Sequence, residues 1–491
     1  MLLVPYIFCK TIFFSSSSLP SSSSSSSPKN VVIVGSGIYG ISTAFEIAQL
    51  CRDSPATVTI LEAASLPKGA SLSRTSQRSK LPFMSSSWGN ACTLGCGSPV
   101  QNLTDFGFWK KIVFSAFSLS SAPPEHLLHL KNKFFRPETL LDPYFYLWGL
   151  CWLKVLVFGY KNSSYAPAGS SPLRAPADER ACIESHPTIS REIYQDGRLI
   201  VEIDPSSSPS SAGDLEATAV RTEPSLLSLP YGVSAMTLQE QDAHGSCEAA
   251  GTVTIDRLLA DEDSNVTVAY ESRATRLIVE NDKIVGVEIN DGESMLKADV
   301  VVVCAGASSG FLLASTAGVR SYVPIQPLRG YSLTLPVKGP AEPPRASIVI
   351  KPYQLYATRL GPDFVRLTCY GEMTPCWDAT SSPSESLRLQ LESLVKHVFP
   401  NVEDWADWDA RVHWMGSRPL TPDGSPVVGR LPPRGLYVNS GGSFNGWRAS
   451  VLSAKVVAAA YADDYGLPRP KVPPGVSLDR YLRVYSPQRF G

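Results

Sequence analysis

Short apolar runs and a helical repeat of apolar positions stand close together near the start of the chain. Residues 31–34 read Val-Val-Ile-Val, which is typical of a parallel strand buried on both faces. Apolar residues then recur at helical spacing over residues 38–50, and residues 58–61 form a second buried run. The order of strand, glycine turn, helix and strand predicts one complete βαβ unit.

Further strands are expected much later, at residues 266–270, 275–279, 284–289 and 300–304. This order, a βαβ unit followed by a long insertion and a returning buried strand, predicts an α/β chain with two domains. We expect an α+β arrangement of these domains, in which a mixed-sheet substrate-binding domain interrupts a Rossmann-type domain. The expected boundaries place residues 29–88, 242–315 and 410–491 in the Rossmann-type domain. Residues 89–241 and 316–409 are expected to form the substrate-binding domain.

Two segments stand apart from this pattern. Residues 1–28 are apolar at first and then almost pure serine, which predicts a disordered head. This head is either a simple tail or a targeting peptide. The location of the protein is therefore open between the cytoplasm and an organelle such as the mitochondrion. Residues 144–160 are the most apolar stretch, but they are too short to span a bilayer. We expect a packed helix there, with a membrane-apposed face as the alternative.

The charge balance narrows the choice of partners. The chain has 44 lysines and arginines and 45 aspartates and glutamates, which gives a formal net charge of -1. No overall positive electrostatic field therefore attracts nucleic acid, and we expect no nucleic-acid partner. The ten cysteines are irregularly spaced and form no CxxC pair or Cys/His cluster. We therefore expect neither a disulfide framework nor a metal site, and a reducing compartment.

The turn after the first strand carries a G-x-G-x-x-G fingerprint. Gly35 permits the tight turn, Gly37 lets the backbone approach a pyrophosphate, and Gly40 lets helix and strand pack closely. Glu62 ends the second strand, where a carboxylate accepts hydrogen bonds from both ribose hydroxyls. The fingerprint predicts a dinucleotide site whose further members are Ser36, Ile38, Tyr39 and Ala63.

The choice between FAD and NAD depends on the rest of the chain. No second glycine fingerprint follows a strand, and the strand pair after Val266 suits a flavin-type insertion. Residues 436–447 predict a strand, a glycine-rich turn and the start of a helix that runs to about Tyr461, whose free backbone N–H groups suit negative charge on a flavin. We therefore expect FAD, with contacts from Gly441, Gly442, Ser443, Asn445, Gly446 and Trp447.

Two longer motifs resemble the FAD-dependent D-amino-acid oxidase superfamily, and within it the small-subunit branch of the D-amino-acid dehydrogenases. They read Pro-Leu-Arg-Gly-Tyr-Ser-Leu-Thr at residues 327–334 and Gly-Ser-Arg-Pro-Leu-Thr-Pro-Asp-Gly-Ser-Pro-Val-Val-Gly at residues 416–429. Fainter similarity lies at residues 242–247 and 353–359. The resemblance implies further cofactor contacts from Thr75, Ser76, Ala274, Ala305 and Gly306.

The resemblance also implies a reaction. Arg418 would pair with the substrate carboxylate, because a guanidinium is bidentate and permanently charged, and Tyr331 or Tyr353 would supply a phenol beside it. Hydride transfer from the Cα of a D-amino acid to the flavin would leave an imino acid, which water hydrolyses to a 2-oxo acid and ammonia. Strand periodicity places His413 on the opposite face from Arg418, so it receives no role.

Alternatives remain open at this stage. Arg418 would bind the carboxylate of a secondary amine such as sarcosine, proline or a glycated amino acid equally well, so oxidation of such a substrate is one alternative function. A flavoprotein scaffold without enzymatic turnover is the other. Dioxygen and a quinone are both open as electron acceptors. The chain also departs from the sequence pattern of the family at several positions. Ser79-Lys80-Leu81 follow Ser76, Gly442 stands in place of a histidine, and Thr368-Cys369 stand in place of glycines. Residues 89–104 match no part of the family pattern.

Overall fold

The computed structural model describes residues 28–53, 56–64, 93–94, 137–158, 176–194, 198–204, 232–239, 243–245, 247–261, 265–319, 321–339, 343, 347–350, 355–378, 383–399 and 401–490. Several predicted features lie outside these residues. They are the serine-rich head up to residue 27, the site candidates Thr75, Ser76 and Tyr353, the segment Ser79-Lys80-Leu81, and residues 89–104 apart from the short strand β3 (Thr93–Leu94).

The fingerprint lies in a six-stranded sheet with the order β18-β19-β12-β1-β2-β8. Its members are β1 (Asn30–Val34), β2 (Thr57–Leu61), β8 (Val266–Ala269), β12 (Val300–Val303), β18 (Val427–Leu431) and β19 (Leu436–Ser440). Four pairings are parallel, and only β18 runs antiparallel to its neighbour. The central strands are apolar and buried at residues 31–34 of β1 and along the whole of β12, as expected where both faces of the sheet are covered.

Different elements cover the two faces of this sheet. On one face the core includes α2 (Ile38–Leu50), α6 (Cys247–Ala260), α10 (Gly446–Tyr465) and α11 (Leu478–Val484). On the other lies the three-stranded sheet of β9 (Ala274–Glu280), β10 (Lys283–Ile289) and β11 (Ser294–Lys297), with α7 (Ser309–Ser315). Helix α10 runs four residues past its predicted end because Gly466, at φ 67°, is the first left-handed residue.

A second, seven-stranded sheet has the order β17-β13-β16-β15-β14-β5-β6. Its strands are β5 (Arg198–Asp204), β6 (Gly232–Gln239), β13 (Gln326–Pro336), β14 (Ser347–Ile350), β15 (Leu355–Leu360), β16 (Phe364–Met373) and β17 (Val412–Leu420). Helices α8 (Glu385–Val398) and α9 (Val402–Trp405) pack on one face of it. A small sheet of β3, β7 (Ala243–Gly245) and β4 (Ile193–Tyr194) completes the strands.

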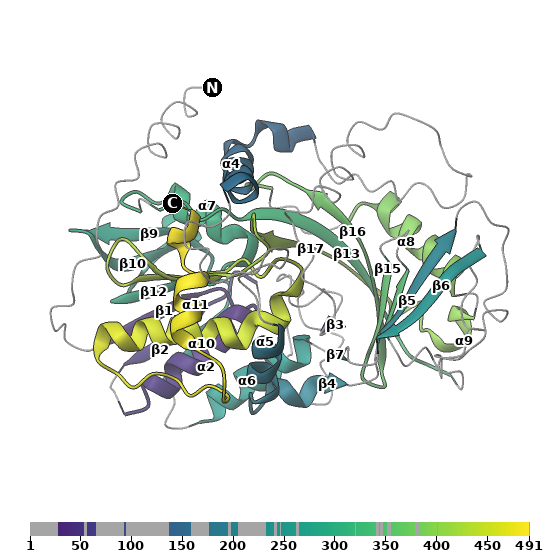
Figure 1. Ribbon diagram of the computed structural model, residues 1–491, viewed down its shortest axis with the longest axis horizontal. Helices are drawn as coiled ribbons and strands as arrows, with labels where there is room; N and C mark the ends of the chain where they lie inside the picture. Colours follow the sequence, from purple (N-terminus) through teal and green to yellow (C-terminus); the bar gives the residue numbers. More distant parts are fainter. Residues whose placement is uncertain are drawn as a thin grey trace.

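The long strands β13, β16 and β17 extend from the neighbourhood of the six-stranded sheet into the second sheet (Figure 1). Two elements differ from the predicted boundaries. Strand β17 follows residue 410 but pairs along its whole length with β13, so the second sheet reaches Leu420. Helix α5 (Pro176–Glu184) lies within the predicted substrate-binding segment, but its Glu179 pairs with Arg448 of α10 at 2.8 Å. Both differences arise from long-range contacts that local patterns do not carry.

The apolar segment predicted at residues 144–160 is helix α4 (Pro143–Phe158), which lies above the long strands in Figure 1. Trp148 is buried, and its Nε1 donates to the Leu420 carbonyl at 2.9 Å. On the other side Tyr146, Leu150 and Leu153 are about half exposed. No helix in the described ranges has the length and apolar content needed to cross a membrane.

Candidate active site

The turn between β1 and α2 depends on two glycines. Gly35 has φ +103°, and a Cβ there would lie 2.8 Å from the Cys304 carbonyl oxygen. A Cβ at Gly40 would lie 1.8 Å from the Gly35 carbonyl oxygen, so only glycine lets the helix approach the strand this closely. Gly37 is the N-cap residue of α2 and has no side chain to satisfy the first N–H groups of the helix. The positive end of the helix dipole at this N-terminus favours an anion such as a phosphate.

Glu62 lies directly beside this turn. Its Oε2 accepts from the Ser36 N–H at 3.1 Å and from the Ser36 hydroxyl, and its Oε1 accepts from the Ala64 N–H at 2.8 Å. These three bonds orient a partly buried carboxylate at the end of β2, while Ala63 next to it is exposed. Burial, together with the Glu62 charge, raises the pKa of the nearby Tyr270 phenol. The carboxylate is therefore held where the fingerprint predicts a ribose.

Two more predicted residues border the glycine turn. Ala305 and Gly306 follow β12, and Gly306 has φ +55°. The Ser440 hydroxyl donates to the Gly306 carbonyl at 3.0 Å, which joins this segment to the C-terminal turn. Burial raises the pKa of the neighbouring Cys304 thiol to about 12, so a neutral sulfur stands beside the expected phosphates. Ala274 begins β9, next to Ser272, whose N–H donates to the Glu62 carbonyl at 2.8 Å.

The C-terminal turn reaches α2 through Tyr39. A Cβ at Gly442 would lie 2.3 Å from the Tyr39 hydroxyl and 2.5 Å from the Gly446 Cα, so this position is closed to larger residues. The absence of histidine at 442 therefore has a local reason, since Tyr39 fills that space. Ser443 adopts φ +51° and its hydroxyl accepts from the Thr421 N–H at 3.2 Å.

Helix α10 begins directly after this turn. Its N-cap residue Asn445 makes no side-chain cap bond to the first N–H groups of the helix. A buried network holds this turn against α2, because the Asn439 amide donates to the Thr43 hydroxyl at 2.9 Å and that hydroxyl donates to the Tyr39 carbonyl at 2.7 Å. Trp447 is 4% exposed and packs in the core of the helical layer, so its indole serves the core more than the predicted cofactor contact.

Arg418 lies on β17 opposite Leu328 of β13, and its guanidinium lies over Gly330. A Cβ at Gly330 would lie 2.5 Å from Arg418 Nη1, so glycine makes the space in which the guanidinium rests. Burial lowers the pKa of Arg418, although a guanidinium still remains charged at neutral pH. No carboxylate of the described ranges pairs with it, and none contributes to its pKa. A partly buried cation without a carboxylate partner among the described residues is suited to bind an anionic ligand.

The motif predicted that Tyr331 lies beside Arg418, but the structure places the two side chains on opposite faces of the sheet. Tyr331 is directly opposite Met415, and Arg418 is three residues from Met415, so the two side chains project to opposite faces of the sheet. The Tyr331 hydroxyl instead donates to Glu372 at 3.4 Å, and neighbours on its face pack against α8. His413 lies on the same face as Tyr331 and is 2.7 Å from Glu392 of α8, away from Arg418.

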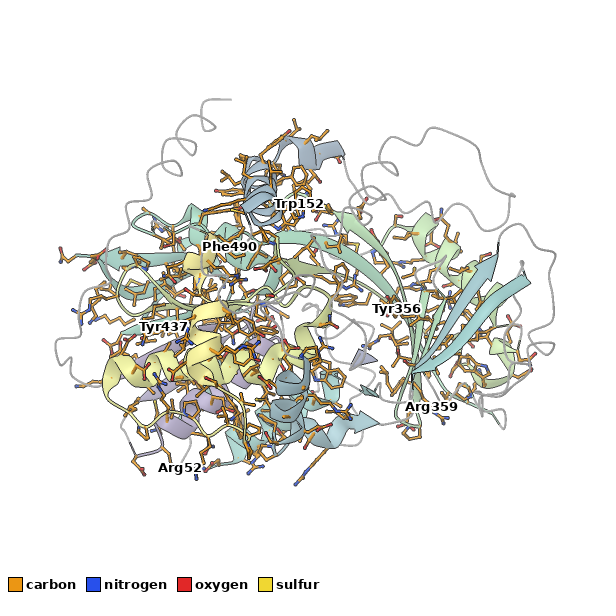
Figure 2. All side chains as sticks on the ribbon, in the orientation of Figure 1. Arg52, Trp152, Tyr356, Arg359, Tyr437 and Phe490 are labelled. Atoms are coloured by element: carbon orange, nitrogen blue, oxygen red, sulfur yellow. The ribbon has the colours of Figure 1, made fainter. Side chains whose placement is uncertain are left out.

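The phenol on the Arg418 face belongs to Tyr356, which the sequence analysis did not select. Tyr356 of β15 pairs with Thr368, Thr368 pairs with Ser332, and Ser332 pairs with Trp414, four residues from Arg418. Directly opposed residues share a face, so Tyr356 and Arg418 project the same way. Tyr356 also acts electrostatically on Arg418, and Figure 2 labels it on the middle part of the structure. The signal was present in the segment from 353 to 359, where strand register places Tyr356 on this face and the other tyrosine lies outside the described residues.

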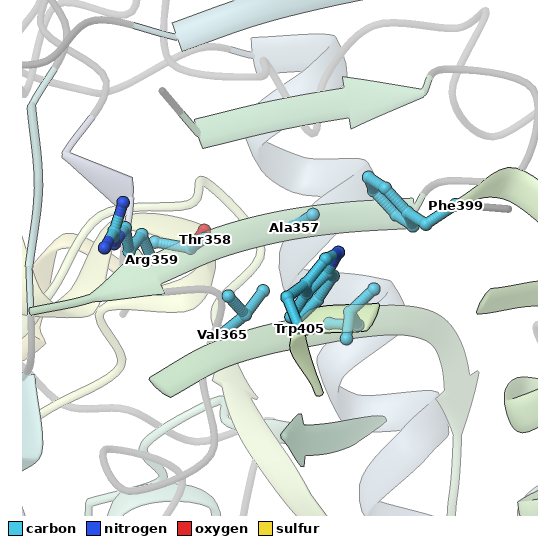
Figure 3. Close-up of a pocket in the computed structure, with 7 residues that line it drawn as sticks. Ala357, Thr358, Arg359, Val365, Phe399 and Trp405 are labelled. Atoms are coloured by element: carbon cyan, nitrogen blue, oxygen red, sulfur yellow. The ribbon is translucent and has the colours of Figure 1, made fainter. Parts of the chain in front are cut away.

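The Arg418 face points toward the nucleotide-binding sheet. Leu360 of β15 shares this face with Tyr356 and packs in the core cluster that contains Ile38 of α2. The opposite face, covered by α8 and α9, holds a small hollow lined by Ala357, Thr358, Arg359, Val365, Leu367, Phe399 and Trp405 (Figure 3). Because that hollow is mostly apolar and lies behind the sheet, it is not the site that Arg418 serves.

A dinucleotide cradle in one sheet and a partly buried guanidinium on the facing sheet are the arrangement expected of a flavin-dependent oxidoreductase. The cradle suits FAD, since the α2 N-terminus, Glu62 and the glycine turn before α10 converge on it. Residues 252–460 match the family DAO, described as FAD dependent oxidoreductase. Residues 252–460 are therefore similar to the FAD-dependent oxidoreductases of this family, and this match confirms the resemblance, the fold class and the cofactor predicted from the sequence.

Relatives and solved structures agree with this assignment. A D-amino acid dehydrogenase of Rhizobium rhizogenes is 27% identical over 445 residues, which cover 87% of this chain and 94% of the relative. Glycine oxidase from Geobacillus kaustophilus is similar in structure with a TM-score of 0.51 at 17% identity, covering 92% of this chain and 98% of that one. Amadoriase I from Aspergillus fumigatus gives a TM-score of 0.54 at 14% identity, covering 91% and 89%. At these identities the structures show a shared fold.

Proposed function

We propose that this FAD-dependent oxidoreductase oxidatively deaminates a D-amino acid to a 2-oxo acid and ammonia. The observation that carries the proposal is Arg418, a partly buried guanidinium over Gly330 that has no carboxylate partner among the described residues. The D-amino acid dehydrogenases that resemble the chain over most of its length support the same substrate class.

Each residue of the pocket has a defined task in this reaction. Arg418 binds the substrate carboxylate through two parallel N–H donors, which fixes both the position and the rotation of the amino acid. Gly330 leaves the space for the guanidinium, and the Tyr356 phenol donates a hydrogen bond from the same face. Bound FAD would supply the acceptor for the hydride of the substrate Cα–H bond, and water would then hydrolyse the resulting imino acid to the 2-oxo acid and ammonia. Orientation in a dry pocket supplies much of the rate, so no histidine base is required.

Anaerobic reduction of the purified holoprotein tests the proposal. D-amino acids should bleach the flavin absorbance, with the matching L-amino acids and with N-methyl amino acids as comparison substrates. Subsequent addition of air or of a quinone identifies the acceptor. Bleaching by secondary amines alone would transfer the reaction to N-substituted substrates. A flavin that no amino acid or amine reduces would contradict an enzymatic role and favour a scaffold.

Arg418→Ala isolates the carboxylate clamp. We expect at least a hundredfold loss in the second-order rate constant for flavin reduction, because removal of one partner of a desolvated charge pair costs about 2–5 kcal/mol. Arg411→Ala is the matched control, since Arg411 lies just before the same strand but pairs with Glu392 at 2.6 Å on the other side of the sheet. Unchanged kinetics in Arg418→Ala would remove this residue from the clamp.

A further inference from the structure

Two hydroxyl groups on the Arg418 face have no hydrogen-bond partner in the part of the chain that the structure describes. Ser332 and Thr368 are each 1% exposed, and both side-chain oxygens are fully buried. A buried hydroxyl without a partner costs free energy, so such groups in a native fold require an explanation. The two residues are direct neighbours across β13 and β16.

The strand register places these hydroxyls in a row beside the proposed substrate carboxylate. The row runs Trp414, Ser332, Thr368 and Tyr356 across four strands. Ser332 lies two residues along β13 from Gly330, a distance of about 7 Å in an extended strand. The Trp414 indole leans toward Arg418, because a Cβ at Gly416 would lie 2.1 Å from its ring. The row is thus one amino-acid length from the guanidinium.

In the next row of the same face one pair of polar groups is hydrogen-bonded, whereas the buried hydroxyl of Ser347 at the β14 end of the row also has no partner in the described residues. Arg366 is 2% exposed, and its Nε donates to the Thr334 hydroxyl at 3.0 Å. On the opposite face of the same strands, Leu333, Leu335 and Leu367 pack beneath α8. Two adjacent buried hydroxyls without partners, in the row nearest to Arg418 on this side of the sheet, are the arrangement expected of a ligand subsite.

We propose that Ser332 and Thr368 form the subsite for the substrate side chain, and that this side chain carries a neutral hydrogen-bonding group such as a hydroxyl or an amide. The inference depends on the proposed function, because the carboxylate on Arg418 sets the position of the substrate. Two hydroxyls offer both donors and acceptors but no opposite charge. An apolar side chain of equal size leaves both hydroxyls unpaired, which is the basis of strong discrimination.

Isosteric substrate pairs test the subsite in anaerobic flavin reduction of the holoprotein. D-threonine should have a second-order rate constant at least ten times that of D-valine, and D-asparagine at least ten times that of D-leucine. Thr368→Val and Ser332→Ala should each reduce these ratios by about tenfold while retaining bound FAD. Ser417→Ala is the matched control, because Ser417 neighbours Arg418 on the opposite face and should leave the ratios unchanged.

The outcomes separate this inference from the proposed function. Preference for the apolar member of each pair, preference for D-aspartate or D-glutamate, or an equal loss for both members in the two variants would overturn the subsite. Reduction of the flavin by D-alanine in those cases would still support the deamination. A failure of every amino acid to reduce the flavin would overturn the proposed function and the subsite together.

Discussion

The position of Arg418 depends on a glycine almost ninety residues earlier in the chain. Gly330→Ala would place a Cβ 2.5 Å from Arg418 Nη1 and force the guanidinium away. We expect binding of the amino acid to weaken by about ten to a hundredfold, since small displacements in a site have effects of this size. Substrate titration followed by flavin absorbance measures the change.

Gly371→Ala is the control for that variant. A Cβ at Gly371, on the neighbouring strand β16, would meet Leu328 at 3.6 Å, which is an ordinary contact. Both variants should retain FAD. Equal effects of the two substitutions would show that the sheet, and not the guanidinium, had been disturbed.

The two tyrosines of the sheet differ in the face on which they lie. Tyr356→Phe should lower the second-order rate constant for flavin reduction by roughly tenfold, or about 1.5 kcal/mol, because it removes a hydrogen bond to a charged carboxylate. Tyr331→Phe should leave this constant within about twofold, because its phenol contacts Glu372 on the other face. Stopped-flow measurement of both variants decides whether Tyr331, as the motif indicates, or Tyr356, as the strand register indicates, acts beside Arg418.

At the scale of elements, the close approach of α2 to β1 depends on Gly40. Gly40→Ala would place a Cβ 1.8 Å from a backbone oxygen that cannot move without opening the turn. We expect loss of FAD, measured by flavin content after purification, and a loss of stability of about 1–3 kcal/mol or more. Gly251→Ala, on α6 against the flexible end of Ile41 at 3.2 Å, should retain FAD and change stability by less than about 1 kcal/mol.

The scale of elements also explains which local predictions agree with the structure. Residues 38–50 form α2 as predicted, because periodic burial and a glycine turn are both local signals. The end of α10 was predicted four residues early, since the apolar pattern fades before Gly466 ends the helix. The place of strand β17 in the seven-stranded sheet could not be predicted locally, because a strand's partner is chosen by long-range pairing.

At the scale of the whole molecule, stability should depend on pH through His186. Its Nδ1 accepts from the Ile189 N–H at 3.3 Å, its ring packs against Phe45 of α2 at 4.5 Å, and burial lowers its pKa to about 3. Below pH 6.5 the His186 imidazole binds a proton in the unfolded chain, whereas in the folded chain it binds this proton only near pH 3. The contribution of this residue is therefore fully present above pH 6.5 and is lost as the pH falls toward 3.

His186→Asn tests this dependence, because asparagine retains an acceptor but does not titrate. Between pH 7 and pH 5 the free energy of unfolding of the native protein should fall by about 2 kcal/mol more than that of the variant. Urea unfolding at the two pH values measures the difference. Parallel pH profiles would show that another group controls acid sensitivity.

The sequence by itself determined the cofactor cradle and its family, because glycine spacing, an acidic strand end and apolar runs act within about thirty residues. It also identified Arg418, whose motif is contiguous. Only the tertiary structure decided which side chains accompany Arg418. Tyr331 and Tyr356 are equally plausible in a linear reading, but in a pleated sheet one step of register moves a side chain to the other face. The unpaired hydroxyls of Ser332 and Thr368 likewise become visible only when four strands, from residues 326 to 420, lie side by side.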